Sequence, residues 1–292
     1  AWLDKLKEGD KVRFRAAEVK GNLTVVTLDA ANAVTPAFDW RAFFTSIGVN
    51  DTKDFSLSHP KYFAAMQREL AETPVKDWQA YLRWHLVNGA AANLSKRFVD
   101  ADFAFTGTTL RGQKALKPRD ERTVDQMNTL LGDPLGQLFV AKHFPPEAKA
   151  RMMVMIGNLK TALRARLEQL PWMGEATRAQ AIEKWSTFTP KIGYTEVWKD
   201  YSGVALARDA HFANVRTLQR HLTKLNLAKI GKPVDRRVWG MPPQQVNAYY
   251  NATWNEIVFP AGILQPPFFD MNADDARSEE HTSELQSPCT IS

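Results

Sequence analysis

The chain has 292 residues, of which 44% are hydrophobic, and carries a formal net charge of +6. This length is sufficient for two domains with a sizeable core. Because its basic residues are scattered among acidic ones, the charge predicts a solvated surface and argues against a nucleic-acid-binding face. The single cysteine, Cys289, excludes an internal disulfide framework. We expect no transmembrane helix, since no run of about 18 apolar residues occurs, and no signal peptide at the start of the chain.

Residues 3–28 predict a β-hairpin, with one strand near Val12 and a second over Leu23–Leu28. The segment resembles the C-terminal strands of the small periplasmic copper-binding barrel of copper/silver efflux systems. That resemblance implies that residues 1–33 are foreign to the rest of the chain, with a junction near residues 29–34. The alternative is a native hairpin at the rim of a helical domain. We expect no copper site, because the segment lacks Met and His ligands.

The middle of the chain, from about residue 36 to 227, predicts helices. Pro146 is typical of a first helical position, and Thr177 with Gln180 forms a capping-box pattern. Methionines at positions 152, 153 and 155 follow helical spacing, which favours a core face over a copper site. No two histidines lie four residues apart, so we assign none of them a catalytic or metal-binding role.

Two short strands are predicted near the end of the chain. Alternating apolar and polar residues predict a strand over 246–251, and Asn251–Thr253 predicts a turn. A second strand follows over Asn255–Phe259, and Pro260 should end its ladder. Prolines then hold the chain extended before Phe268. Two interpretations fit this pattern: a hairpin buried in a core, or a wall that binds an extended peptide along an exposed edge.

A family resemblance covers the same stretch. The sequences NAYY (247–250) and NEIVFPAGILQPPFF (255–269), preceded by WGMPP (239–243), resemble the signature of the neprilysin/endothelin-converting-enzyme family of zinc metallopeptidases. With the helical segments upstream, the resemblance spans about residues 34–275.

The resemblance implies a mainly α fold. We expect a multi-helix domain over residues 34–212, then the first β-strands of a thermolysin-like α+β catalytic domain over 213–276. The N-terminal β-hairpin over 1–33 would be an extra element.

The resemblance also implies roles for four residues. In the family, the equivalents of Asn247 and Ala248 bind the substrate backbone, and those of Ile263 and Phe268 line the pocket after the scissile bond. The implied substrates are peptides, the implied cofactor is one zinc ion, and the implied location is the periplasm or the cell exterior.

The zinc-binding motif His-Glu-x-x-His does not occur in the 292 residues. Residues 277–292 resemble a translated sequencing adaptor and are expected to be a non-native tail. We therefore predict a peptidase fragment with no catalytic and no metal-binding residues, inactive as it stands. The alternative is a non-enzymatic helical module that binds peptides or proteins. The fragment hypothesis predicts an exposed apolar face near Ile257, Phe259, Ile263 and Phe268.

Overall fold

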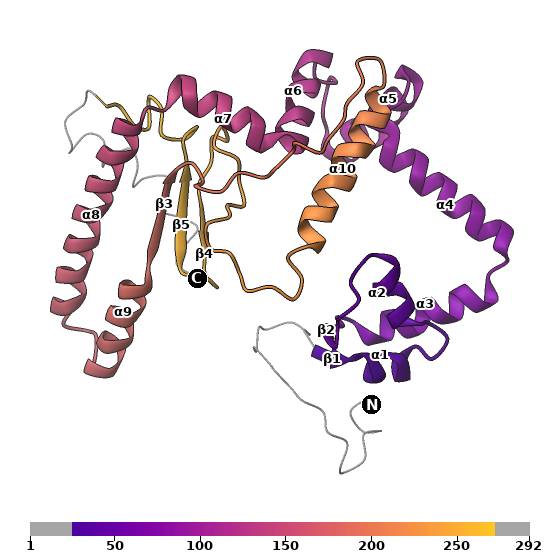
Figure 1. Cartoon of the computed structure of the whole chain (residues 1–292), viewed down its shortest axis with the longest axis horizontal. Helices are drawn as coiled ribbons and strands as arrows, with labels where there is room; N and C mark the ends of the chain where they lie inside the picture. The colour runs from indigo at the N-terminus through magenta and orange to yellow at the C-terminus, as the bar shows by residue number, and fades with distance from the viewer. Residues whose placement is uncertain (1–24, 272–292) are drawn as a thin grey trace, which may run out of the picture. The chain divides into compact units, whose positions relative to one another are not determined.

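The computed structural model describes residues 25–271 and divides the chain into two compact units (Figure 1). The first unit comprises residues up to 116 with 208–214 and 220–233, and the second comprises 117–207, 215–219 and the residues from 234 onward. The domain boundaries predicted at residues 33/34, 212/213 and 276/277 remain predictions.

The first unit consists mostly of helices, of which the N-terminal ones surround an aromatic cluster. Trp40 lies at its centre, 6% exposed, and its indole nitrogen donates to Thr35 Oγ1 at 2.8 Å. Rings of Phe44, Phe55 and Phe63 pack around it. The elements are β1 (Val25–Thr27), α1 (Leu28–Val34), α2 (Trp40–Ser46), β2 (Asp54–Ser56), α3 (Pro60–Glu72), α4 (Val75–Ala90), a 3₁₀ turn η2 (Ala91–Asn93), α5 (Lys96–Asp102) and a π-helical segment η3 (Phe103–Thr109).

The strand predicted over residues 23–28 is present as β1, but its partner is β2. The two strands pair antiparallel, with Val26 opposite Phe55, and the strand predicted near Val12 lies outside the described residues. The extra N-terminal hairpin is therefore not confirmed. Leu28 does not end the strand but begins α1, which spans the predicted junction at 29–34 and buries Ala31 in the aromatic cluster.

Exposed apolar side chains gather on α4. No residue of this helix is buried, and six large apolar side chains are 41–72% exposed. They are Val75, Tyr81, Leu82, Trp84, Leu86 and Val87. A helix that is apolar on most of its circumference is normally covered in a folded protein, so α4 has the character of a contact surface.

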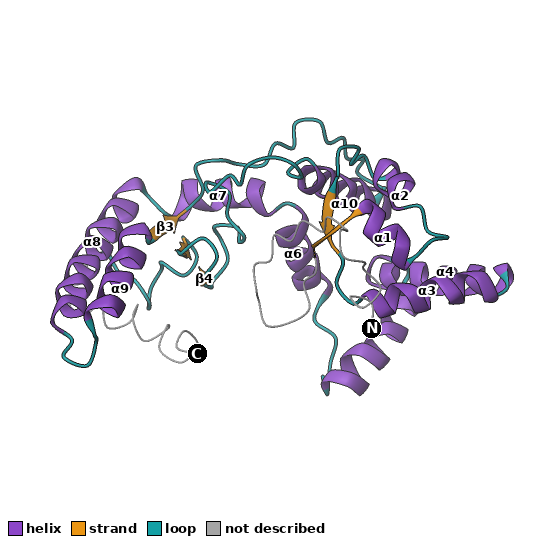
Figure 2. Ribbon diagram, turned by 90° about the horizontal axis from the view of Figure 1, so that it is seen from below, coloured by secondary structure: helices purple, strands orange, loops and turns teal. Residues whose placement is uncertain are grey.

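The second unit packs helices against a three-stranded sheet. Its elements are α6 (Arg119–Leu130), α7 (Gly132–His143), α8 (Pro146–Gln169), α9 (Glu175–Thr187), β3 (Thr189–Gly193), β4 (Tyr249–Asn251) and β5 (Glu256–Pro260), and α10 (His211–Leu227) contributes residues to both units. The sheet order is β3-β5-β4, with β5 parallel to β3 and antiparallel to β4. The helices α8 and α9 lie side by side (Figures 1 and 2).

The core of the second unit lies between α8 and the sheet. Met152, Met155 and Ile156 of α8 pack in one cluster with Ile192 of β3 and with β5. The cluster also contains Ile257, Phe259 and Ile263, which are 9%, 3% and 5% exposed. The prediction of an exposed apolar face at these residues is therefore wrong, because β5 is the central strand and α8 covers that face of the sheet. Phe268, also predicted to be exposed, is half-buried against the cluster.

The mainly α prediction is confirmed, with local departures. The predicted helical stretch is interrupted by β2 and β3. Pro146 begins α8 as expected, but α9 already begins at Glu175, so Thr177 lies inside the helix and the predicted capping box is wrong. Pro260 is the last residue of β5, paired with Gly193, so the ladder ends later than predicted.

Candidate functional site: the β4 edge

The sheet order places β4 at an edge of the described sheet. This strand starts at Tyr249, so Asn247 and Ala248 lie directly before it, although the sequence predicted a strand from residue 246. Local hydrogen bonds explain the shorter strand. Asn247 Oδ1 accepts from the main-chain nitrogen of Ala248 at 2.8 Å, and the nitrogen of Asn247 donates to Gln245 O at 3.0 Å. Such local bonds compete with ladder pairing.

The predicted turn between the two strands is confirmed. Asn251 Oδ1 accepts from the main-chain nitrogens of Thr253 and Trp254, at 3.1 and 3.2 Å. Asn255 then adopts a left-handed backbone, with φ of 50°, a conformation that Asn tolerates better than most residues. Its side chain accepts a hydrogen bond from the Tyr250 hydroxyl at 2.9 Å. The turn therefore fixes β4 against the start of β5.

The four residues implied in substrate binding fall in two environments. Asn247 is exposed, and Ala248 is half-buried against the core cluster of the second unit. Ile263 is a buried member of that cluster, and Phe268 is half-buried on its surface. The cluster thus joins three of the four residues, and Asn247 is the one that faces solvent. The neighbouring Phe269 is only 2% exposed and packs in the core.

The residues 239–248, here called the approach segment, are anchored before they reach the edge. The nitrogen of Gly240 donates to the Tyr249 hydroxyl at 2.8 Å, and the nitrogen of Gly262 donates to Pro243 O at 2.7 Å. A Cβ on Gly262 would lie 2.6 Å from Gln244 O, so this close approach requires glycine. Sequence reasoning did not identify these anchors.

A hollow of about 300 Å³ adjoins the approach segment. Gln244 reaches across from the segment, and its Nε2 donates to Asn128 Oδ1 at 3.0 Å and to Gly132 O at 3.1 Å. The lining residues are Asn128, Thr129, Pro242, Gln244 and Gln245. Four of these five side chains carry a polar group, so the hollow offers hydrogen-bonding groups beside the edge.

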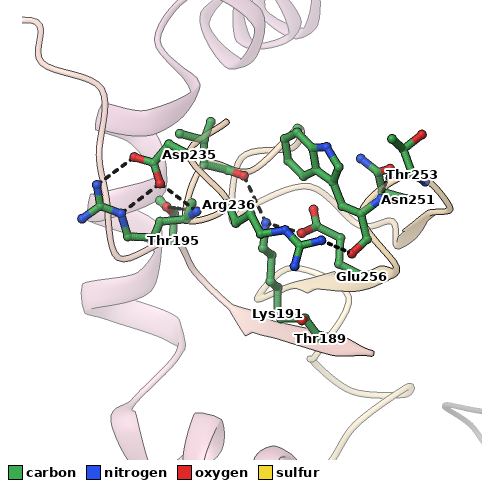
Figure 3. Close-up of polar contacts among 12 residues, drawn as sticks. Thr189, Lys191, Thr195, Asp235, Arg236, Asn251, Thr253 and Glu256 are labelled. Carbon is green, nitrogen blue, oxygen red and sulfur yellow. Dashed lines mark hydrogen bonds and ion pairs between the residues drawn. The ribbon is translucent and has the colours of Figure 1, made fainter. Parts of the chain in front are cut away.

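A buried ion pair lies on the same sheet (Figure 3). Lys191 Nζ of β3 lies 2.8 Å from Glu256 Oε2 of β5, and the two side chains are 8% and 1% exposed. Among the described residues neither carboxylate oxygen accepts a hydrogen bond of good geometry, so the lysine ammonium compensates for their burial. The sequence signal for this pair is a glutamate that opens an otherwise apolar strand, since buried glutamates are nearly always paired.

Polar contacts hold the residues just before the approach segment (Figure 3). Arg237 donates to Asp235, and this contact lowers the pKa of Asp235 to about 2. Arg236 Nη2 donates to Trp254 O at 2.6 Å, and Thr195 Oγ1 donates to Arg237 O at 3.0 Å. Partial burial raises the pKa of Tyr249.

Residues 25–271 include no group of three or more His, Cys, Asp or Glu side chains that could hold a metal ion. The part of the chain that the structure describes therefore does not fit a zinc site. None of its helices has the length and apolar character needed to cross a membrane.

Comparison with known proteins places this geometry in a family. Residues 8–195 and 247–278 match two models described as peptidase family M13. The first match begins at residue 8, so it includes most of the segment that the sequence predicted to be foreign. The second extends to residue 278, just into the predicted tail.

Curated relatives and solved structures also indicate this family. An endothelin-converting enzyme homolog from Locusta migratoria is 32% identical over 262 residues, covering 84% of this chain and 36% of the relative. Endothelin-converting enzyme 1 from Bos taurus is 31% identical over 265 residues, covering 86% and 35%. The open state of the Mycobacterium tuberculosis zinc metalloprotease ZMP1 superposes with a TM-score of 0.79 at 40% identity, covering 87% of this chain and 40% of that chain.

The chain thus spans well under half the length of these relatives. One family model matches more than half of the chain, and the matched segments include the β4 edge. The chain belongs to peptidase family M13, the family of neprilysin and the endothelin-converting enzymes.

Proposed function

We propose that this chain carries the peptide-binding edge of a zinc-dependent metalloendopeptidase. Asn247 and Ala248 would bind the main chain of an extended peptide substrate, and Ile263 and Phe268 would shape the pocket for one of its side chains. The observation that carries the proposal is the position of β4 at the sheet edge, with Asn247 exposed directly before it.

The physical basis is strand addition. An extended peptide that pairs with an edge strand gains main-chain hydrogen bonds, and neighbouring apolar side chains select among peptides. Asn247 Oδ1 already accepts from the nitrogen of Ala248, and the Nδ2 group of Asn247 can donate to a peptide carbonyl. Ala248 and Phe268 lie half-buried on the core cluster beside it, where they supply apolar contact.

Zinc enters the proposal through the family alone, since the solved relative ZMP1 is a zinc metalloprotease. The described residues do not fit a zinc site, so we derive no catalytic step from them. The 292 residues contain no His-Glu-x-x-His motif, and we propose that they bind peptides without hydrolysing them. We place the peptidase in the periplasm or outside the cell, as the resemblance implies.

Two measurements on the purified chain test this proposal. The probe is a fluorescein-labelled seven-residue peptide with a central phenylalanine among alanine and glycine. Fluorescence anisotropy should show saturable binding that weakens at least severalfold in Asn247→Ala but not in Asn158→Ala, an exposed position on α8. Chromatography of the peptide after incubation with added zinc should show no cleavage. Zinc-dependent cleavage, or equal binding by both variants, would contradict the proposal.

A second candidate function, a non-enzymatic binding module, is favoured by the exposed apolar side chains of α4. In that case the same probe, or a partner protein, binds the helix rather than the β4 edge. Replacing Trp84, which is 60% exposed, by Gln then abolishes binding and Asn247→Ala does not.

A further inference from the structure

The sheet of the second unit has two different faces. Side chains alternate between the faces of a strand, and Ile257 and Phe259 of β5 point to the α8 core. Glu256 is on the opposite face of the same strand. Lys191 lies two residues beyond Thr189, which pairs with Glu256 in the parallel register. The Lys191–Glu256 pair therefore occupies the face away from α8.

The ammonium of Lys191, on β3, contacts two other segments of the chain. It lies 2.8 Å from Glu256 Oε2 and donates to Val238 O at 3.2 Å. It also lies 5.4 Å from the centre of the Trp254 ring, within range of a cation–π contact. Val238 directly precedes the approach segment, so the ammonium ties the start of that segment to the sheet.

Two further hydrogen bonds hold the approach segment between Val238 and the β4 edge. Gly240 is held by the Tyr249 hydroxyl and Pro243 by the nitrogen of Gly262. The contact between Lys191 and Val238 O is the one that depends on a buried charge. Such a pair is weak evidence for stability, because desolvation offsets much of its attraction. The ion pair therefore matters more for the position in which it holds the carbonyl of Val238 than for stability.

We propose that Lys191 and Glu256 are a positioning pair for the peptide-binding edge. Glu256 holds the ammonium in place, and the ammonium holds the carbonyl of Val238. Together they set where the approach segment meets the sheet and hence how Asn247 and Ala248 are presented. This inference rests on the proposed function, because it assigns a role in peptide binding to residues that do not touch the peptide.

The test replaces both charges at once. Removing one partner would leave a buried uncompensated charge and endanger folding, whereas replacement of both by apolar residues of similar volume is often tolerated. In Lys191→Met/Glu256→Met the buried volume on this face of the sheet is kept and no unpaired polar side chain is introduced, but no ammonium remains to bind Val238 O. The matched control is Lys96→Met/Asp100→Asn, which removes an exposed ion pair in the first unit.

Three readouts are compared in the whole chain. We expect the melting temperature of the double variant to stay within about 5 °C of the parent, while affinity for the labelled seven-residue peptide falls about tenfold, as expected for loss of a hydrogen bond to a charged group. Hydrogen exchange should accelerate in residues 238–249 and stay unchanged in β3 and β5. The control should change none of these.

The outcomes separate the two proposals. Peptide binding by the parent with unchanged affinity and exchange in the double variant overturns the positioning role. Acceleration spread evenly over β3, β5 and the approach segment also overturns it, because the pair would then act on the stability of the whole sheet. No peptide binding by the parent overturns the proposed function, and the role of the pair in binding falls with it.

Discussion

The hydroxyl of Tyr249, the first residue of β4, accepts a hydrogen bond from the main-chain nitrogen of Gly240 at 2.8 Å. The strand that presents the edge thus also anchors the segment that leads to it. This single hydrogen bond to the Tyr249 hydroxyl closes residues 240–249 into a loop.

Tyr249→Phe removes this acceptor and leaves the ring in place. We expect a loss of about 1 kcal/mol in the free energy of unfolding and a severalfold weaker affinity for the labelled peptide. Urea denaturation and anisotropy measure the two effects. Tyr62→Phe, at a tyrosine that is 62% exposed, is the control and should behave as the parent. Equal affinity of Tyr249→Phe and the parent would show that the loop closure is irrelevant to the edge.

Gly262→Ala tests the close approach of the approach segment to the sheet. The added Cβ would lie 2.6 Å from the carbonyl oxygen of Gln244, and backbone atoms must shift to relieve the overlap. Overpacking of this kind costs about 1–3 kcal/mol, which urea denaturation can measure. Gly203→Ala has no atom within 4 Å of its new Cβ and should be nearly neutral. Equal stability of the two variants would contradict the described packing.

Met152→Ala tests the core beneath the sheet. Met152 is fully buried, whereas its neighbour Met153 is 42% exposed. Truncating a buried Met costs about 2–5 kcal/mol, and we expect Met153→Ala to cost under about 1 kcal/mol. Thermal or urea unfolding distinguishes them. The reverse order would mean that α8 presents another face to the sheet.

The pKa of Asp235, lowered to about 2 by Arg237, predicts a pH dependence. Because the folded value lies below the ordinary value of 3.8, the contact contributes stability above about pH 4 and loses it as the pH falls toward 2. The carboxyl carbon resonance of Asp235 should titrate with a midpoint near 2. In Arg237→Gln the midpoint should move up toward the ordinary value. A parent midpoint already near 3.8 would exclude the contact in solution.

The parts of the site that sequence could predict are local. The Asn251 turn follows from side-chain bonds to the next residues, and a strand predicted over Asn255–Phe259 from its apolar run is observed over Glu256–Pro260. Both are confirmed. The role of Asn247 and Ala248 came from resemblance alone and stays a prediction. The structure adds that they precede β4 rather than lie within it, with Asn247 exposed and Ala248 half-buried.

The parts that sequence could not predict depend on distant pairing. The Lys191–Glu256 contact exists because β3 pairs in parallel with β5 across a long stretch of chain, and a local pattern does not show which distant strand is the partner. The same holds for the pairing of β1 with β2. Burial of Ile257 and Phe259 was also missed, because it depends on α8 lying over the sheet.

The most direct test of the peptide-binding edge is hydrogen exchange of the whole chain with and without saturating seven-residue peptide. Strand addition to β4 predicts slower exchange of the amides at residues 247–251 and no change on α4. Slower exchange confined to residues 75–90, or none anywhere, would contradict it.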